Sequence, residues 1–304
     1  MKRVLKFLAA ASALVFLAAV AAIVWLTVFF DADVYRDEIE EAVRRHTGRE
    51  IDIEGPLAVK VFPRIVVEAG RMTLAARDGF GPDPMVEMEG AAVFLQARPL
   101  LRGKIEIDRI RFDSPRVRLA VNDVGESAWG DLAARLQHAA GGGAPIGDEQ
   151  FLGVGLAALA VQGLVVDDGE LQWSDAFRGT YFIAADIDLE MERLRHREAG
   201  GLSLKARIVD EARGASLDIA VTAMVRADFE TLDTDITMLE VEIAGSAFHA
   251  RATAKSVDLR GLRAAPEFIA GDVVVAASRG DTSVELSAPL LRYRRSGNTL
   301  AADV

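Results

Sequence analysis

The chain has 304 residues, 51% of them hydrophobic, and no cysteine, which excludes disulfide scaffolds, thiolate metal sites and cysteine nucleophiles. The formal net charge is −11, and without Lys2, Arg3 and Lys6 the remaining 32 basic and 46 acidic residues give −14. An acidic body argues against nucleic acid as a partner, and its length suffices for one large domain or two ordinary ones.

The N-terminal residues 7–30 form an unbroken run without a charged side chain. A helix of this length spans about 36 Å, enough to cross a hydrocarbon core of ~30 Å. Basic residues precede the run, whereas Asp31, Asp33 and Asp37 follow it, a bias that keeps the N-terminus in the cytoplasm. The run therefore predicts a single-pass transmembrane anchor over residues 1–30, with the rest of the chain exported.

A cleaved secretory signal is the alternative interpretation of this run. Such signals have an apolar core of only ~7–15 residues. The small residues Ala19 and Ala21 could belong to a cleavage site, but the apolar run continues beyond them through residues 23–26. The length of the run therefore favours the anchor.

A short amphipathic helix is predicted directly after the run. Asp33 can cap a helix from about Val34 to Thr47, and Gly48 is placed to end it. One apolar stripe follows the helical period of i, i+3, i+4 and i+7. Its members are Ile39, Ala42, Val43 and His46.

Beyond Gly48 the hydrophobic period changes to two, which predicts β-strands in the first region, residues 31–135. Ile105 and Ile107 share one face, while Ile110 and Phe112 are out of phase with them. A bulge near Arg109 would reconcile the two registers. Ser114-Pro115 then interrupts the strand, and Val117, Leu119 and Val121 resume the alternation, so we predict a meander of short antiparallel strands.

A Gly/Ala-rich segment, residues 136–150, has no periodicity and is predicted to be a flexible linker. The second region, residues 151–304, shows one-sided strands at spacings close to 8–12 residues and no helix after residue 166. Its alternating apolar positions include Leu171 and Trp173; Ile183, Ala185, Ile187, Leu189 and Met191; Leu204, Ala206 and Ile208; and Leu217, Ile219, Val221, Ala223 and Val225.

A sheet with one apolar and one charged face must pack on a partner, close into a barrel, or curl into an apolar trough. The residues alone leave these three outcomes open. The fold class that follows is mainly β.

The order of the elements resembles the AsmA family of bacterial envelope proteins, which are related to chorein-type lipid-transfer proteins. After the apolar run, the resemblance is carried by the segments Tyr35–Ile39, Thr47–Arg49, Ile51–Gly55, Gly79–Gly81, Arg98–Ile105, Ser114–Pro115, Gly125–Leu132 and Val166–Asp175. Relatives usually continue well beyond this length, and residues 300–304 stop inside an alternating segment. We therefore expect a short or truncated member of the family.

The resemblance implies a long curled antiparallel sheet that forms an apolar groove. It also implies a bacterial inner-membrane protein with a periplasmic body. Such a protein would bind phospholipid and either move it or support maintenance of the outer membrane. Other envelope proteins are further partners that the resemblance implies. Exposing a lipid tail to water costs about 0.8 kcal/mol per CH₂, so such transfer requires a shielded apolar surface. The alternative is a scaffold or regulator that assists outer-membrane protein assembly without lipid transport.

The apolar positions on successive strands are the candidate lipid-binding residues. They are Ile105, Ile107, Val117, Leu119, Val121, Leu217, Ile219 and Val221. The ordinary alternative for these residues is the closed core of a β-sandwich. Small residues such as Ala220, Ala223, Ala250, Ala252 and Ala254 would leave room for acyl chains, or would let two sheets pack closely.

No catalytic motif is found in the sequence. His46, His138, His196 and His249 are scattered without metal-ligand spacing, and no GxSxG, P-loop or dinucleotide fingerprint occurs. The acidic series Asp186, Asp188, Glu190 and Glu192 alternates with apolar residues, which is typical of the solvated face of a strand. We therefore expect no enzymatic activity, no cofactor and no metal site.

Overall fold

The computed structural model describes residues 32–132 except 62, 63, 101 and 105, and residues 163–294 except 193, 195, 211–213, 229, 230, 232 and 262–266. The predicted anchor, residues 1–30, and the predicted linker, residues 136–150, lie outside the described residues. Among the helices that the structure describes, none is both long and apolar enough to cross a membrane.

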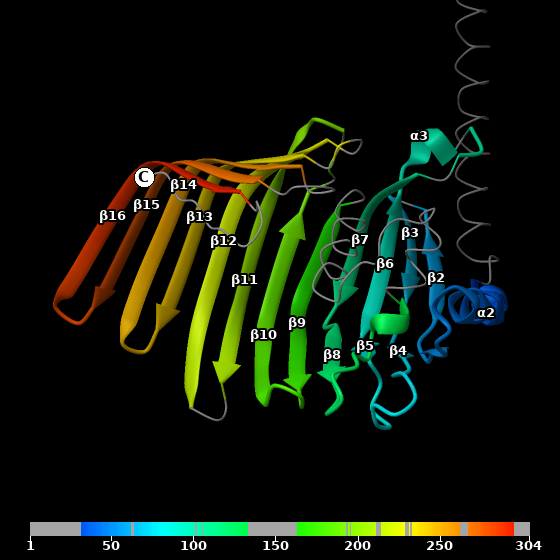
Figure 1. Ribbon diagram of the computed structural model, residues 1–304. Helices are drawn as coiled ribbons and strands as arrows, with labels where there is room; N and C mark the ends of the chain where they lie inside the picture. Colours follow the sequence, from blue (N-terminus) through cyan, green and yellow to red (C-terminus); the bar gives the residue numbers. More distant parts are fainter. Residues whose placement is uncertain are drawn as a thin grey trace, which may run out of the picture.

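The described strands form one open, curled sheet, which confirms the expectation of a mainly β fold (Figure 1). Two short helical elements precede it, η1 (Ala32–Tyr35) and α2 (Arg36–Thr47). The first eight strands are short: β1 (Ile51–Ile53), β2 (Leu57–Lys60), β3 (Ile65–Ala69), β4 (Met72–Leu74), β5 (Val86–Met88), β6 (Gly90–Leu95), β7 (Ile107–Asp113) and β8 (Arg116–Val121). One helical turn, α3 (Ala97–Leu100), connects β6 to β7.

The remaining strands are 12 or 13 residues long, about 40 Å each at ~3.3 Å per residue. They are β9 (Leu164–Asp175), β10 (Thr180–Met191), β11 (Ala199–Asp210), β12 (Ala215–Ala227), β13 (Thr234–Gly245), β14 (Phe248–Arg260), β15 (Glu267–Arg279) and β16 (Thr282–Arg294). Each pairs antiparallel with the next. The predicted spacing of 8–12 residues was therefore too short for this half.

The first eight strands form four longer strands, β1/β2, β3/β4, β5/β6 and β7/β8, each of which is interrupted once. β1 and β2 are separated by Gly55-Pro56, and β7 and β8 by Ser114-Pro115, where proline removes a backbone donor. Because the pairs β1/β4 and β2/β3 lie side by side, the interruptions line up across the sheet. Asp168 in β9 and Asp186 in β10 continue the line with φ values of 54° and 50°.

Gly55 and Gly70 form the tightest point of this line of interruptions. A Cβ on Gly55 would lie 2.4 Å from the Cα of Gly70, inside any permitted contact. We expect Gly55→Ala to lower the urea midpoint of unfolding strongly, because the backbones of two strands must separate. Gly201→Ala is the control, since its Cβ would meet only side-chain atoms of Glu192, at 3.4 Å or more. Equal midpoints for the two variants would contradict the conclusion that the close approach of Gly55 and Gly70 requires glycine.

One part of the sheet is parallel, which the predicted antiparallel meander did not include. β7 and β8 lie one after the other along β9, and both run in the same direction as β9. Parallel neighbours need a connection of a dozen or more residues, and residues 122–163 between β8 and β9 meet that need. The predicted bulge near Arg109 is confirmed, because the β6/β7 register shifts between Arg109 and Ile107.

The helix α2 covers the free edge of the kinked first strand. Its C-terminal cap is Gly48, with φ 72°, as predicted. The predicted N-cap was wrong: η1 precedes the helix, and Asp33 instead accepts the N–H of Leu57 at 3.1 Å. Arg36 donates to the carbonyl of Gly55 at 2.8 Å, and Glu40 accepts the N–H of Ile53 at 3.3 Å. These side chains occupy backbone groups that another strand could otherwise bind.

Candidate functional site

One continuous row of apolar residues crosses the whole sheet. Residues directly opposite each other on paired strands share a face, so the strand registers define the row. Its twelve members, one per strand, are Leu57, Ala69, Ala91, Phe112, Val166, Leu189, Leu204, Val221, Val241, Ala252, Val275 and Leu286. At ~4.8 Å per strand the row is roughly 55 Å long.

Further apolar rows lie beside the first, two residues along each strand. One contains Val59, Val67, Val93, Ile110, Leu164, Met191, Leu202 and Ala223, and continues through Leu239, Ala254, Val273 and Ala288. Another contains Ala206, Ile219, Ile243, Ala250, Ala277 and Val284. Together these rows form a surface that we call the apolar face.

The opposite face of the sheet carries charge. The same registers place Asp188, Lys205, Ala220, Glu242 and Arg251 in one row across β10–β14. Arg207 bridges Asp186 at 2.6 Å and Asp218 at 2.9 Å, and these two carboxylates raise the pKa of its guanidinium. We call this surface the charged face. Its ion pairs are exposed to solvent, and each contributes little to stability, on the order of 0–1 kcal/mol.

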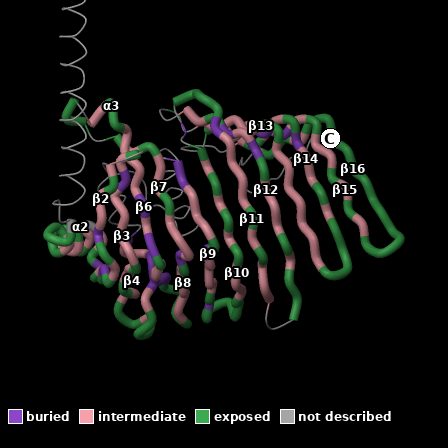
Figure 2. Tube along the Cα trace, turned by 180° about the vertical axis from the view of Figure 1, so that it is seen from behind, coloured by how far each residue is buried: buried purple, intermediate pink, exposed green. Residues whose placement is uncertain are grey.

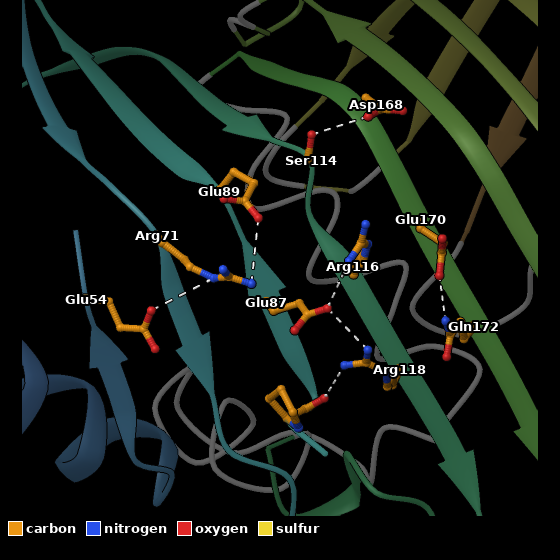
Figure 3. A network of polar contacts seen from close by, with 11 residues as sticks. Glu54, Arg71, Glu87, Glu89, Ser114, Arg116, Arg118, Asp168, Glu170 and Gln172 are labelled. Atoms are coloured by element: carbon orange, nitrogen blue, oxygen red, sulfur yellow. Dashed lines mark hydrogen bonds and ion pairs between the residues drawn. The ribbon is translucent and has the colours of Figure 1, made fainter.

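The charged face continues into the first half of the sheet. Arg71 lies between Glu54 and Glu89, and Glu87 accepts from Arg116 and Arg118, at 3.4 and 3.2 Å (Figure 3). These side chains lie on the opposite face from Val117, because Glu87 and Arg116 are paired one position away from the Val86/Val117 pair. The sheet is therefore two-sided over most of its length.

The sheet bends toward the apolar face. In β13 the register shifts next to Met238, which has φ 52° and is 67% exposed on the outer side. On the inner side of the bend, Ala254, Val257 and Ala270 are buried and contact Ile236, Leu239, Val273 and Leu291 from both sides of the bend. Figure 2 shows buried residues gathered near these upper strand ends. The apolar face is therefore the inner surface of the curl.

Four of the predicted lipid-binding residues lie on the apolar face and are not covered by another described segment of the chain. Ile107 is opposite Leu95, and Leu217, Ile219 and Val221 lie on β12 at alternate positions, all partly accessible. Ile105 lies outside the described residues. Of the small residues predicted to leave room for chains, Ala220 lies on the charged face, opposite Lys205.

The other three predicted residues, Val117, Leu119 and Val121, also lie on the apolar face but under a loop of the chain itself. Leu119 is only 3% exposed and packs with Ala128 and Trp129. The ring of Trp129, 1% exposed, lies 5.4 Å from that of Trp173 on β9. Trp129 therefore covers the apolar face at this position, as a structural plug.

Arg49 holds this plug in place. Its guanidinium, 3% exposed, donates to both carboxylate oxygens of Asp131, at 3.2 and 2.6 Å. It also donates to the carbonyls of Ala75 and Ala128, at 3.2 and 2.6 Å. A single buried cation thereby joins the end of α2, the β4–β5 connection and the plug. The sequence signal for it is only an arginine after a helix-ending glycine.

The polar residues weighed as catalytic candidates are dispersed. Asp186, Asp188 and Glu190 lie on the charged face, where a depression of about 310 Å³ includes Asp186, Arg207 and His249. His196 lies in a turn, 4.0 Å from Asp228. Within the described ranges, no three acidic or histidine side chains are arranged to hold a metal ion.

The arrangement suits contact with a long apolar molecule better than local chemistry. Its inner surface is extended and apolar, and its outer surface is charged. The sequence model of the AsmA family matches residues 1–261, most of the chain. A search among curated proteins finds no match.

Proposed function

We propose that this chain, which belongs to the AsmA family, binds phospholipid by laying the acyl chains along the apolar face. The observation that carries the proposal is the unbroken apolar row across twelve strands. A family of bacterial envelope proteins and a large open sheet both fit such a role.

The energetics favour an extended ligand of low polarity. Removing acyl chain from water yields about 0.8 kcal/mol per CH₂, and the apolar face offers no polar partner along the row. A charged headgroup would instead stay at the rim, in water. Tails can occupy any of several equivalent positions along the row, so the same surface would serve for binding and for transfer.

The proposed location is the bacterial inner membrane, with the N-terminus cytoplasmic and the sheet in the periplasm, where the protein supports maintenance of the outer membrane. The supports are the uncharged run of residues 7–30 and the basic residues before it. The proposal includes no catalytic step.

Mass spectrometry of lipid bound to residues 32–304 tests the proposal. This fragment lacks the apolar run and is isolated without detergent. We expect phospholipid to accompany it through purification. A folded fragment that carries no lipid, and that acquires none from phospholipid vesicles, would contradict the proposed function and favour a scaffold.

A further inference from the structure

Two connections at one end of the sheet are basic in an otherwise acidic protein. Residues 61–64 join β2 to β3, and residues 96–106 join β6 to β7. Arg64, Arg98, Arg102 and Lys104 stand in these connections against one acidic residue, Glu106, a net charge of +3, while the chain carries −11.

The sheet brings these connections together. Ile65 at the start of β3 is opposite Leu95 at the end of β6, and Leu95 is opposite Ile107 at the start of β7. The longer connection is folded on itself, since the N–H of Lys104 donates to the carbonyl of Pro99 at 3.0 Å. We call the described residues of these two connections, which include Arg64, Arg98, Arg102 and Lys104, the basic loops.

The four cations are exposed and form no ion pair with any described residue. Elsewhere in the sheet Arg71, Arg207 and Arg251 each meet two carboxylates. Unpaired cations gathered on one surface attract a polyanionic partner, whereas paired ones do not.

The basic loops are also close to the point where the chain enters the described fold. Asp33 accepts the N–H of Leu57 at the start of β2, and its pKa is lowered by that bond and by Arg36. From Leu57 the strand leads to Arg64 in seven residues, at most about 25 Å of extended chain. The basic loops are therefore within reach of the surface of a membrane that holds an anchor ending at residue 30.

We propose that the basic loops dock on the anionic phospholipid headgroups of the membrane that anchors the chain. This inference rests on the proposed anchoring. The contact fixes the orientation of the sheet, with one end of the apolar face held at a lipid surface. It requires no specific headgroup, only negative charge.

The absence of cysteine allows a direct test on the full chain. Ala97→Cys, in the exposed α3 turn, carries an environment-sensitive dye, and the protein is reconstituted into vesicles of phosphatidylcholine with or without phosphatidylglycerol. We expect the dye to report an interfacial environment only in the anionic vesicles. The signal should fall with added salt, which screens the attraction, and should resist inorganic phosphate at equal ionic strength.

A matched pair of double variants separates docking from overall charge. Arg98→Glu with Arg102→Glu should reduce the anionic-lipid signal by roughly threefold or more. Arg226→Glu with Arg279→Glu changes the net charge equally at two exposed arginines outside the basic loops, and should leave the signal unchanged.

Three outcomes would overturn the proposal. They are equal wild-type signals in both kinds of vesicle, equal losses in both double variants, and competition by inorganic phosphate. Lipid bound to the apolar face is measured separately, by mass spectrometry of residues 32–304 of the same variants isolated without detergent. Absence of docking by the wild-type protein, together with lipid retained on the apolar face, would refute this inference and leave the proposed function intact. A urea midpoint equal to wild type establishes that each variant is folded.

Discussion

Arg49→Ala is expected to lower the free energy of unfolding by about 3 kcal/mol, among the largest effects of any single side chain in this protein. The substitution removes four donated hydrogen bonds, and it leaves the carboxylate of Asp131 and the carbonyl of Ala128 without their partner. Since those groups belong to the loop that carries Trp129, the plug should detach from β8 and β9. Urea unfolding reports the first effect. Tryptophan emission, to which Trp129 and its neighbour Trp173 both contribute, reports the second.

Two control variants make the Arg49 prediction specific. Arg49→Lys keeps the charge but cannot form the two-pronged bond to Asp131, so its loss should be intermediate. Arg71→Ala removes an exposed arginine, which contacts Glu54 and Glu89 at 4.0 and 3.7 Å, and should cost under about 1 kcal/mol. A midpoint for Arg49→Ala equal to that of Arg71→Ala would contradict the role given to Arg49.

Val221→Asp is expected to reduce the phospholipid retained by the protein at least about tenfold, because an unpaired carboxylate in contact with acyl chains is strongly unfavourable. Val221 occupies the middle of the apolar row, between Leu204 and Val241 on the neighbouring strands. Its side chain is only partly buried, so the fold should survive the change. Mass spectrometry of bound lipid measures the effect.

Ala220→Asp is the matched control for Val221→Asp. The residue is adjacent in sequence but lies on the charged face, where the new carboxylate would lie between Lys205 and Glu242 on the neighbouring strands. Lipid retention should equal that of the wild type. Equal losses in the two variants would show that retention depends on strand integrity or net charge, and the assignment of the apolar face would then be wrong.

The family, the β-rich fold and much of the apolar alternation were predictable because they depend on local patterns. Leu217, Ile219 and Val221 have the simple period of two, and the structure places all three on one face. The resemblance to the AsmA family is confirmed by the match over residues 1–261. In the first half, Ser114-Pro115 marked the interruption between β7 and β8.

Where a long strand is interrupted by a bulge, the sequence pattern predicted the wrong face for some residues. Ile183, Ala185 and Ile187 alternate in sequence and were predicted to share one face. In the structure Asp186 adopts positive φ, so Ile183 and Ala185 face the charged side while Ile187 faces the apolar side. An aspartate among alternating residues gives no local signal of such a bulge.

Contacts between distant segments were equally hidden. Nothing near Leu119 in the sequence shows that Trp129 will fold back over it, or that Arg49 will hold that loop from a distance of 82 residues. The parallel pairing of β7 and β8 with β9 depends on a long connection. These features arise from tertiary packing, which overrides a prediction made strand by strand.

Site-specific photo-crosslinking in intact cells at Val221 and at Thr222 tests the central claim most directly, because the two positions are adjacent and face opposite sides of β12. The account predicts lipid adducts from a photoreactive side chain at position 221 and none from position 222. Adducts of similar yield from both positions, or from neither in a folded protein, would contradict the claim that the apolar face holds lipid.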